Sequence, residues 1–83
     1  MKLIDIRENY EYKKGHIPNS INICKDLLEL VPETYLNKID SYILYCDYGI
    51  TSSELSNKLN NKGYNTKSLK NGYIGWLKNN PNL

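Results

Sequence analysis

Four short runs rich in apolar residues alternate with polar segments along the chain. Runs of this length, bounded by turn residues, are typical of strands. The third run, Tyr42 to Tyr45, is apolar throughout, as expected of a strand in the middle of a parallel sheet, where both faces are buried. We therefore predict four strands, at residues 2–6, 20–24, 42–45 and 64–69.

The polar segments between these runs carry helix signals. Asp26 can cap a helix, because its side chain can accept a hydrogen bond from a free backbone amide. Thr51 and Glu54 match a capping box, which places the start of another helix at Thr51. Gly63 tolerates left-handed backbone and ends that helix. The predicted helices cover residues 8–14, 26–31, 51–62 and 73–77.

Strands that alternate with helices predict an α/β fold, here a small open parallel sheet of about four strands with helices on both faces. The 83 residues are enough for one small domain, residues 1–83. In such a sheet, ligands bind beyond the carboxyl ends of the strands. Arg7, Cys24 and Cys46 stand at three of these ends, so we expect the functional site there.

Composition and charge exclude several classes of function. The net charge of +2 and the lack of a Lys/Arg cluster argue against nucleic-acid binding. No apolar run approaches the roughly 18 residues of a membrane span, and the charged start predicts a cytoplasmic protein without a signal peptide. The two cysteines are not spaced as C-x-x-C, and one His is too few for the usual zinc sets. We therefore expect free thiols and no bound metal.

Cys46 is the candidate nucleophile. It ends the third strand and lies just before a helix start, so the amides of the intervening loop can point at its sulfur and favour the thiolate. Gly49 permits the curl that this requires, because it tolerates positive φ. The carboxylate of Asp47 acts in the opposite direction. Spacing alone leaves an inert buried cysteine as an equal alternative.

Motifs in both halves of the chain resemble those of the rhodanese (sulfurtransferase) family. Asp5-Ile6-Arg7 followed by Gly15-His16-Ile17-Pro18 resembles the family's Asp-x-Arg strand end and Gly-His-Ile-Pro turn. The loop Cys46–Thr51, followed by Ser52, is similar to the family's active-site loop. Asn71-Gly72 and the segment through Trp76 resemble its later Gly-x-x-x-Trp segment. The resemblance covers nearly the whole chain, in order.

The resemblance implies a catalytic Cys46 that takes a sulfane sulfur from thiosulfate or a persulfide, carries it as a persulfide and passes it to a thiol or cyanide. No cofactor or metal is needed for this covalent route. A sulfur-donor protein is a further expected partner. The implied substrate-binding loop comprises Asp47, Tyr48, Gly49, Ile50, Thr51 and Ser52.

Two positions depart from the family pattern. Many members carry a basic residue after the cysteine and an Arg at the sixth loop position, where this chain has Asp47 and Thr51. An anionic donor such as thiosulfate therefore meets a less favourable field, which predicts poor thiosulfate:cyanide activity. The chain also begins at the Asp-x-Arg strand, so the sheet has an exposed edge that favours a homodimer or a partner.

The supporting residues have structural interpretations. We expect Asp5 and Arg7 to form an ion pair that fixes loops, and His16 to be a hydrogen-bonded structural histidine rather than a general base. A cysteine such as Cys24 more often serves only as a small apolar side chain in the core. If its strand neighboured that of Cys46, however, Cys24 could attack a persulfide on Cys46 and leave a disulfide.

Two other functions remain open at this point. A non-catalytic rhodanese-like module that binds a partner or senses redox state is the main alternative. A phosphatase or arsenate reductase on the related fold needs Cys-x5-Arg, and Ser52 occupies the arginine position here. That third function is therefore the weakest of the three.

Overall fold

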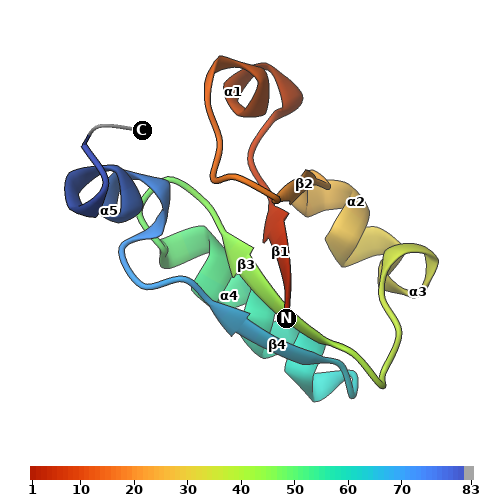
Figure 1. Ribbon diagram of the computed structural model, residues 1–83. Coiled ribbons are helices and arrows are strands. Elements are labelled where there is room, and N and C mark those ends of the chain that lie inside the picture. Colours follow the sequence, from red (N-terminus) through yellow and green to blue (C-terminus); the bar gives the residue numbers. More distant parts are fainter. Residues whose placement is uncertain (82–83) are drawn as a thin grey trace.

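The computed structural model describes residues 1–81, and Figure 1 shows strands and helices that alternate along the chain. The predicted order of elements is confirmed, and Pro32 begins a separate short helix. The elements are β1 (Lys2–Asp5), α1 (Asn9–Lys14), β2 (Ile21–Asn22), α2 (Lys25–Leu30), α3 (Pro32–Tyr35), β3 (Ser41–Tyr45), α4 (Ile50–Asn61), β4 (Asn65–Ser68) and α5 (Gly72–Asn79).

The four strands form one parallel sheet in the order β2-β1-β3-β4. This confirms the predicted α/β fold class. β1 pairs with β3 in register from Lys2 opposite Tyr42 to Asp5 opposite Tyr45, so their carboxyl ends lie together. β2 and β4 are the edges, and both are short, as exposed edges usually are. Pairing of an edge with a second copy of the chain stays a prediction.

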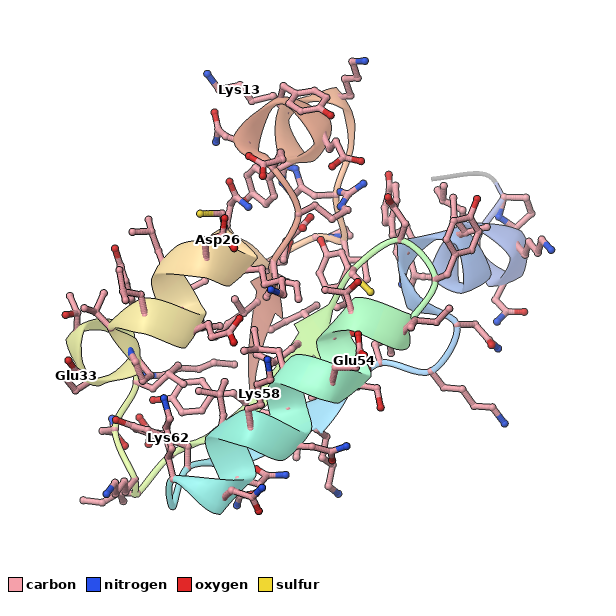
Figure 2. All side chains as sticks on the ribbon, turned by 180° about the vertical axis from the view of Figure 1, so that it is seen from behind. Lys13, Asp26, Glu33, Glu54, Lys58 and Lys62 are labelled. Atoms are coloured by element: carbon pink, nitrogen blue, oxygen red, sulfur yellow. The ribbon has the colours of Figure 1, made fainter. Side chains whose placement is uncertain are left out.

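The main core lies on one face of the sheet. Ile4 and Leu44 point from the central strands onto Leu28 of α2 and onto Leu55 and Leu59 of α4, and all five side chains are buried. Figure 2, seen from behind, shows α2 and α4 side by side on this face, and the two helices are in contact. Burial of these side chains is the main stabilising term, at roughly 1.5–3 kcal/mol each.

The opposite face is covered at its carboxyl end. Figure 1 shows α1 and α5 beyond the ends of the strands, away from the N-terminus of β1. Tyr45 points to this side, where its hydroxyl accepts a hydrogen bond from the Ile17 amide (3.1 Å) and bonds to Ser20 (3.0 Å). Burial raises the pKa of Tyr45 to about 12. This hydroxyl thus holds the loop after α1 against the sheet.

Two predicted helix starts are wrong. α4 begins at Ile50 with Gly49 as its N-cap, and α2 begins at Lys25 with Cys24 as its N-cap. Because each helix starts before its proposed cap, Thr51 and Asp26 both lie inside a helix. Neither helix has a side-chain capping bond. The amide of the N-cap residue Gly49 and the first-turn amide of Ser52 donate to the Cys46 sulfur instead, which satisfies two of the free amides at this helix end.

The predicted end of α4 is confirmed. Gly63 has φ of 98°, in the left-handed region, and the next amide, of Tyr64, returns to the carbonyl of Leu59 (3.1 Å). The strand predicted at residues 20–24 is shorter than expected, because the chain leaves the sheet after Asn22 and starts α2.

Gly72, at the start of α5, lies against the backbone of the Cys46 loop. Its φ is 58°, and a Cβ atom there would lie 2.6 Å from the carbonyl oxygen of Asp47. Gly63 also has positive φ, but the nearest atom to a Cβ there belongs to the flexible side chain of Lys38, at 3.4 Å. A side chain at either glycine would strain the backbone, but only at Gly72 would it also overlap with backbone atoms of another segment.

We expect Gly72→Ala to destabilise the fold by roughly 2–4 kcal/mol, because strain and overlap add. Gly63→Ala is the matched control and should cost about 1 kcal/mol, since strain acts alone. Urea unfolding of both variants measures the difference. Equal losses of stability would show that the contact between α5 and the loop is not tight.

Candidate active site

The Cys46 sulfur lies at the first residue after β3, with hydrogen-bond donors gathered around it. The amide of Gly49 lies 3.2 Å from Sγ and the amide of Ser52 lies 3.3 Å away. The Ser52 hydroxyl is 3.4 Å from the same sulfur. Cys46 is only 9% exposed, so water supplies little of its solvation. Three protein groups therefore stand where solvent would otherwise support a thiolate.

Gly49 produces this arrangement. Its φ of 94° places it in the left-handed region, where a side chain would be strained. The chain reverses at Gly49, so the loop returns over the sulfur and α4 starts with its amides facing Sγ. The positive end of the helix dipole is directed at the same atom. The predicted role of Gly49 in curling the loop is thus visible in the geometry.

The donors change the acidity of the thiol. Burial opposes ionisation, but hydrogen bonds from the Ser52 hydroxyl and from the amides of Ser52, Gly49 and Tyr48 outweigh it and lower the pKa of Cys46. A lowered pKa increases the thiolate fraction near neutral pH, and the thiolate is the nucleophile. The interpretation of Cys46 as an inert buried cysteine is therefore disfavoured.

A second hydroxyl supports Ser52 from below. Ser52 is fully buried, and its Oγ lies 2.6 Å from Oγ of Ser68 on β4. Ser52 has one proton, so when it donates to a thiolate it must accept from Ser68. The neighbouring Ser53 is exposed and does not contact the sulfur. Sequence reasoning missed Ser68, because only the pairing of β3 with β4 brings it near the loop.

The start of α5 holds the loop from the other side. The amide of Tyr73 donates to the carbonyl of Cys46 (2.9 Å), and the amide of Ile74 donates to the carbonyl of Asp47 (3.0 Å). The Asn71-Gly72 turn makes this possible, because both residues have positive φ and start the helix close to β3. The turn was visible in the sequence, but its contact with the Cys46 loop was not.

Arg7 joins three segments beneath the site. Its guanidinium pairs with Asp5 (2.8 Å) and donates to the carbonyl of Gly15 (2.8 Å) and to Asp47 (3.4 Å). It also lies over the ring of Tyr73, 4.3 Å from the centroid. Burial would lower the pKa of Arg7, but the hydrogen bonds and charge of Asp5 keep it above the ordinary arginine value. The structure shows the predicted ion pair of Asp5 and Arg7, with an added bond to Asp47.

A cavity of about 440 Å³ opens above Cys46. Four of the predicted loop residues line it together with the cysteine: Asp47, Tyr48, Ile50 and Thr51. Gly49 and Ser52 contact the sulfur from beneath and do not line the cavity. The predicted loop is therefore one site with two layers, an inner layer of donors and an outer rim.

The other cavity walls come from segments that the sequence did not connect with Cys46. Glu8 and Glu11, from the start of α1, and Lys25 and Asp26, from the start of α2, line the cavity beside Arg7. Only the order of the strands brings these helix starts to the same edge. The sequence pattern indicated helix residues there and no role in the site.

His16 lies away from the cysteine. Its Nδ1 donates to the carbonyl of Tyr12 (2.8 Å), its ring stacks on the Tyr12 ring at 3.7 Å, and it does not line the cavity. These contacts agree with the structural role expected of His16 and offer no contact with the thiol.

The assumption behind a resolving role for Cys24 is wrong. β1 lies between β2 and β3, so the strands that precede Cys24 and Cys46 are not neighbours. Two strand spacings amount to roughly 10 Å, beyond the reach of a disulfide. Both cysteines are free in the structure.

Neither a cluster of metal ligands nor a membrane-spanning helix is found within residues 1–81. No group of three His, Cys, Asp or Glu side chains in this part of the chain is placed to hold a metal ion. No helix in the same range is both long and apolar enough to cross a membrane.

Comparison with known families shows to which family this chain belongs. The family model of the rhodanese-like domain matches residues 1–79. The chain belongs to the rhodanese-like family. A rhodanese-related protein from Thermoplasma volcanium has the same fold, with a TM-score of 0.86 and 28% identity, over 94% of this chain and 77% of that chain.

Relatives of the rhodanese-like chain include proteins named for sulfur transfer. YtwF of Bacillus subtilis, which carries a provisional sulfurtransferase name, is 31% identical over 89% of this chain and 71% of its own. A tRNA sulfurtransferase from Thermoplasma acidophilum is 36% identical over 74% of this chain. A tRNA uridine(34) hydroxylase from Buchnera aphidicola is 31% identical over 89% of this chain. This chain spans only 12% and 26% of these last two proteins.

The acidity of Cys46 can be tested by alkylation. Because the pKa of Cys46 is lowered, its reaction with iodoacetamide should rise with pH at a midpoint below that of an unperturbed cysteine thiol. Ser52→Ala removes one donor, so the midpoint should move upward.

Ser53→Ala is the matched control, since Ser53 is one residue away and exposed, and its midpoint should equal that of the wild type. The rates are read by intact mass in a Cys24→Ser background. A midpoint unchanged by Ser52→Ala would contradict the assigned hydrogen bond.

Proposed function

We propose that this rhodanese-like domain is a sulfurtransferase in which Cys46 carries sulfane sulfur as a persulfide. In the first half-reaction the Cys46 thiolate attacks the outer sulfur of a donor R–S–SH. The donor S–S bond breaks, the leaving thiolate R–S⁻ takes the electron pair, and Cys46–S–SH forms. With thiosulfate as donor, sulfite leaves and the persulfide anion forms. In the second half-reaction an acceptor thiolate or cyanide takes the outer sulfur, and the Cys46 thiolate is restored.

The observation that carries this proposal is the convergence of the Gly49 amide, the Ser52 amide and the Ser52 hydroxyl on one buried sulfur. That arrangement stabilises a thiolate both before the attack and after release of the product. The cavity above the sulfur gives room for a second sulfur atom and a small leaving group. Relatives named as sulfurtransferases support the same class of reaction.

Several properties belong to the same proposal. No cofactor takes part, and the donor is a small persulfide or a sulfur-donor protein. The tRNA substrates named for two relatives are those proteins' substrates, since this chain matches only a small part of each. We place the domain in the cytoplasm, where a reducing environment keeps both cysteines as thiols.

Intact-mass measurement tests the proposal. After incubation with a small persulfide, the wild type should gain the mass of one sulfur atom, because the thiolate attacks the outer sulfur. Cys24→Ser should gain it as well, whereas Cys46→Ser should not. Cyanide should then remove the added mass, which distinguishes a persulfide from an oxidised sulfinic acid of similar mass.

Absence of any gain with every donor would contradict sulfur transfer. It would favour a rhodanese-like module that binds a partner or senses redox state without catalysis. Retention of the gain in Cys46→Ser would show that another residue carries the sulfur.

Thiosulfate should be a poor donor, because Asp47 pairs with Arg7 and Thr51 supplies no charge to the cavity. Thr51→Arg should raise kcat/KM for thiosulfate by roughly tenfold or more, since it adds a cation beside the sulfur. Thr51→Gln, which adds a long side chain without charge, is the control and should give no gain. A wild type already as active as Thr51→Arg would contradict this interpretation of the loop.

A further inference from the structure

The cavity above Cys46 is lined by more acidic than basic side chains. Its carboxylates belong to Glu8, Glu11, Asp26 and Asp47, and its cations are Arg7 and Lys25. Four negative charges and two positive charges leave a formal net charge of −2, before the thiolate itself is counted. The acids come from the starts of α1 and α2 and from the Cys46 loop, so no single element accounts for them.

Neither cation is available to an anionic ligand. Arg7 is held by Asp5 and Asp47, and its side chain is only 6% exposed. The ammonium of Lys25 lies 3.0 Å from Glu29 and 3.9 Å from Asp26. The hydrogen bond and charge of Glu29 raise the pKa of Lys25.

Two of the acids have no cationic partner. Within residues 1–81, neither Glu8 nor Glu11 forms a salt bridge, and Glu8 is exposed. A further acid, Asp26, has only the long contact of 3.9 Å with Lys25 and is 93% exposed, and Figure 2 shows it at the start of α2. These three carboxylates line the cavity and are accessible to a ligand that enters it.

The negative cavity contrasts with the rest of the molecule. The whole chain has a net charge of +2, so the excess of positive charge lies on other surfaces. Figure 2 shows Lys58 on α4, Lys62 just after the end of α4 and Lys13 on α1, and none of the three lines the cavity. A protein with a positive net charge therefore has an excess of acidic side chains around the cavity that leads to its candidate nucleophile.

We propose that the donor for Cys46 is a cationic persulfide, one that carries a positive charge close to its sulfane sulfur. The charge would lie among Glu8, Glu11 and Asp26 while the sulfur reaches Cys46. Two sources share this chemistry, a small amine persulfide and a persulfidated cysteine flanked by Lys or Arg in a partner protein. The exposed side chains of Tyr48 and Ile50 at the rim offer apolar surface to either.

This inference rests on the proposed function and adds the charge of the donor to it. The electrophilic donor is R–S–SH, with the positive charge on R. Attack by the Cys46 thiolate breaks the donor S–S bond and releases R–S⁻, while the proton stays on the transferred sulfur. The positive group on R takes no part in bond breaking. It acts by raising the local concentration of the donor next to the negative cavity.

A matched pair of small donors tests the charge directly. Cysteamine persulfide and 3-mercaptopropionate persulfide share a two-carbon chain, and their electrophilic forms carry one positive and one negative charge, respectively. Loading of Cys46 is followed by intact mass at equal sulfane-sulfur concentration. We expect the cationic donor to load the wild type about tenfold faster, and added salt to slow the cationic donor and accelerate the anionic one.

A charge-neutral variant isolates the three acids. Glu8→Gln, Glu11→Gln and Asp26→Asn, combined in one protein, should reduce the ratio of the two loading rates to about twofold or less. Comparing ratios cancels the intrinsic reactivity of each persulfide. Glu33→Gln is the matched control, because Glu33 is an exposed acid on α3 outside the cavity, and it should keep the wild-type ratio.

Short cysteine persulfide peptides flanked by Lys or by Glu distinguish the two sources. A Lys-flanked peptide that loads faster than cysteamine persulfide identifies a protein carrier, and the reverse order identifies a small amine.

Equal loading by both small donors, or a ratio unchanged in the triple variant, would overturn the inference while leaving sulfur transfer intact. Failure of every donor to load Cys46 would instead overturn the proposed function itself. The salt dependence of the wild type tests the preference for a cationic donor without any substitution.

Discussion

A buried sulfur anion is stable only where donors replace the water it has lost, and this requirement organises the carboxyl edge of the sheet. Cys46 is almost wholly enclosed, so the protein must supply the donors itself. Two amides and a hydroxyl do so, and they can meet at one point because Gly49 reverses the chain. The Ser52 amide in the first turn of α4 donates to the thiol, and no side chain caps this helix.

The segments around the loop are joined through Arg7 and α5. Arg7 connects the end of β1 with the turn after α1 and with Asp47. The first amides of α5 hold the carbonyls of Cys46 and Asp47, and the ring of Tyr73 covers the guanidinium. Each contact joins segments far apart in sequence, so the loop conformation depends on the complete sheet. Local propensity alone would not hold it.

The strands, their parallel arrangement and the cysteine loop could be predicted because they depend on local patterns. The apolar run before Cys46 marks the central strand, and Gly63 marks the end of a helix. The caps at Asp26 and Thr51 were wrong, because tertiary contacts set where those helices start. Ser68 and the acids of α1 and α2 gave no local signal, since only the strand order brings them to Cys46. Local sequence patterns therefore pointed to the candidate nucleophile, Cys46, and to its loop, but not to the side chains that other strands and helices bring beside it.

The order of the strands affects how long a transferred sulfur would remain on Cys46. With β1 between the strands that lead to Cys24 and Cys46, the domain has one thiol at the cavity and no second thiol beside it within residues 1–81. In the proposed reaction, a sulfur placed on Cys46 could not leave by closing a disulfide within the same domain. It would stay until an acceptor from outside removed it. The lifetime of the loaded state would then depend on the supply of acceptor, and the domain would act as a sulfur store that empties at the rate at which acceptor arrives.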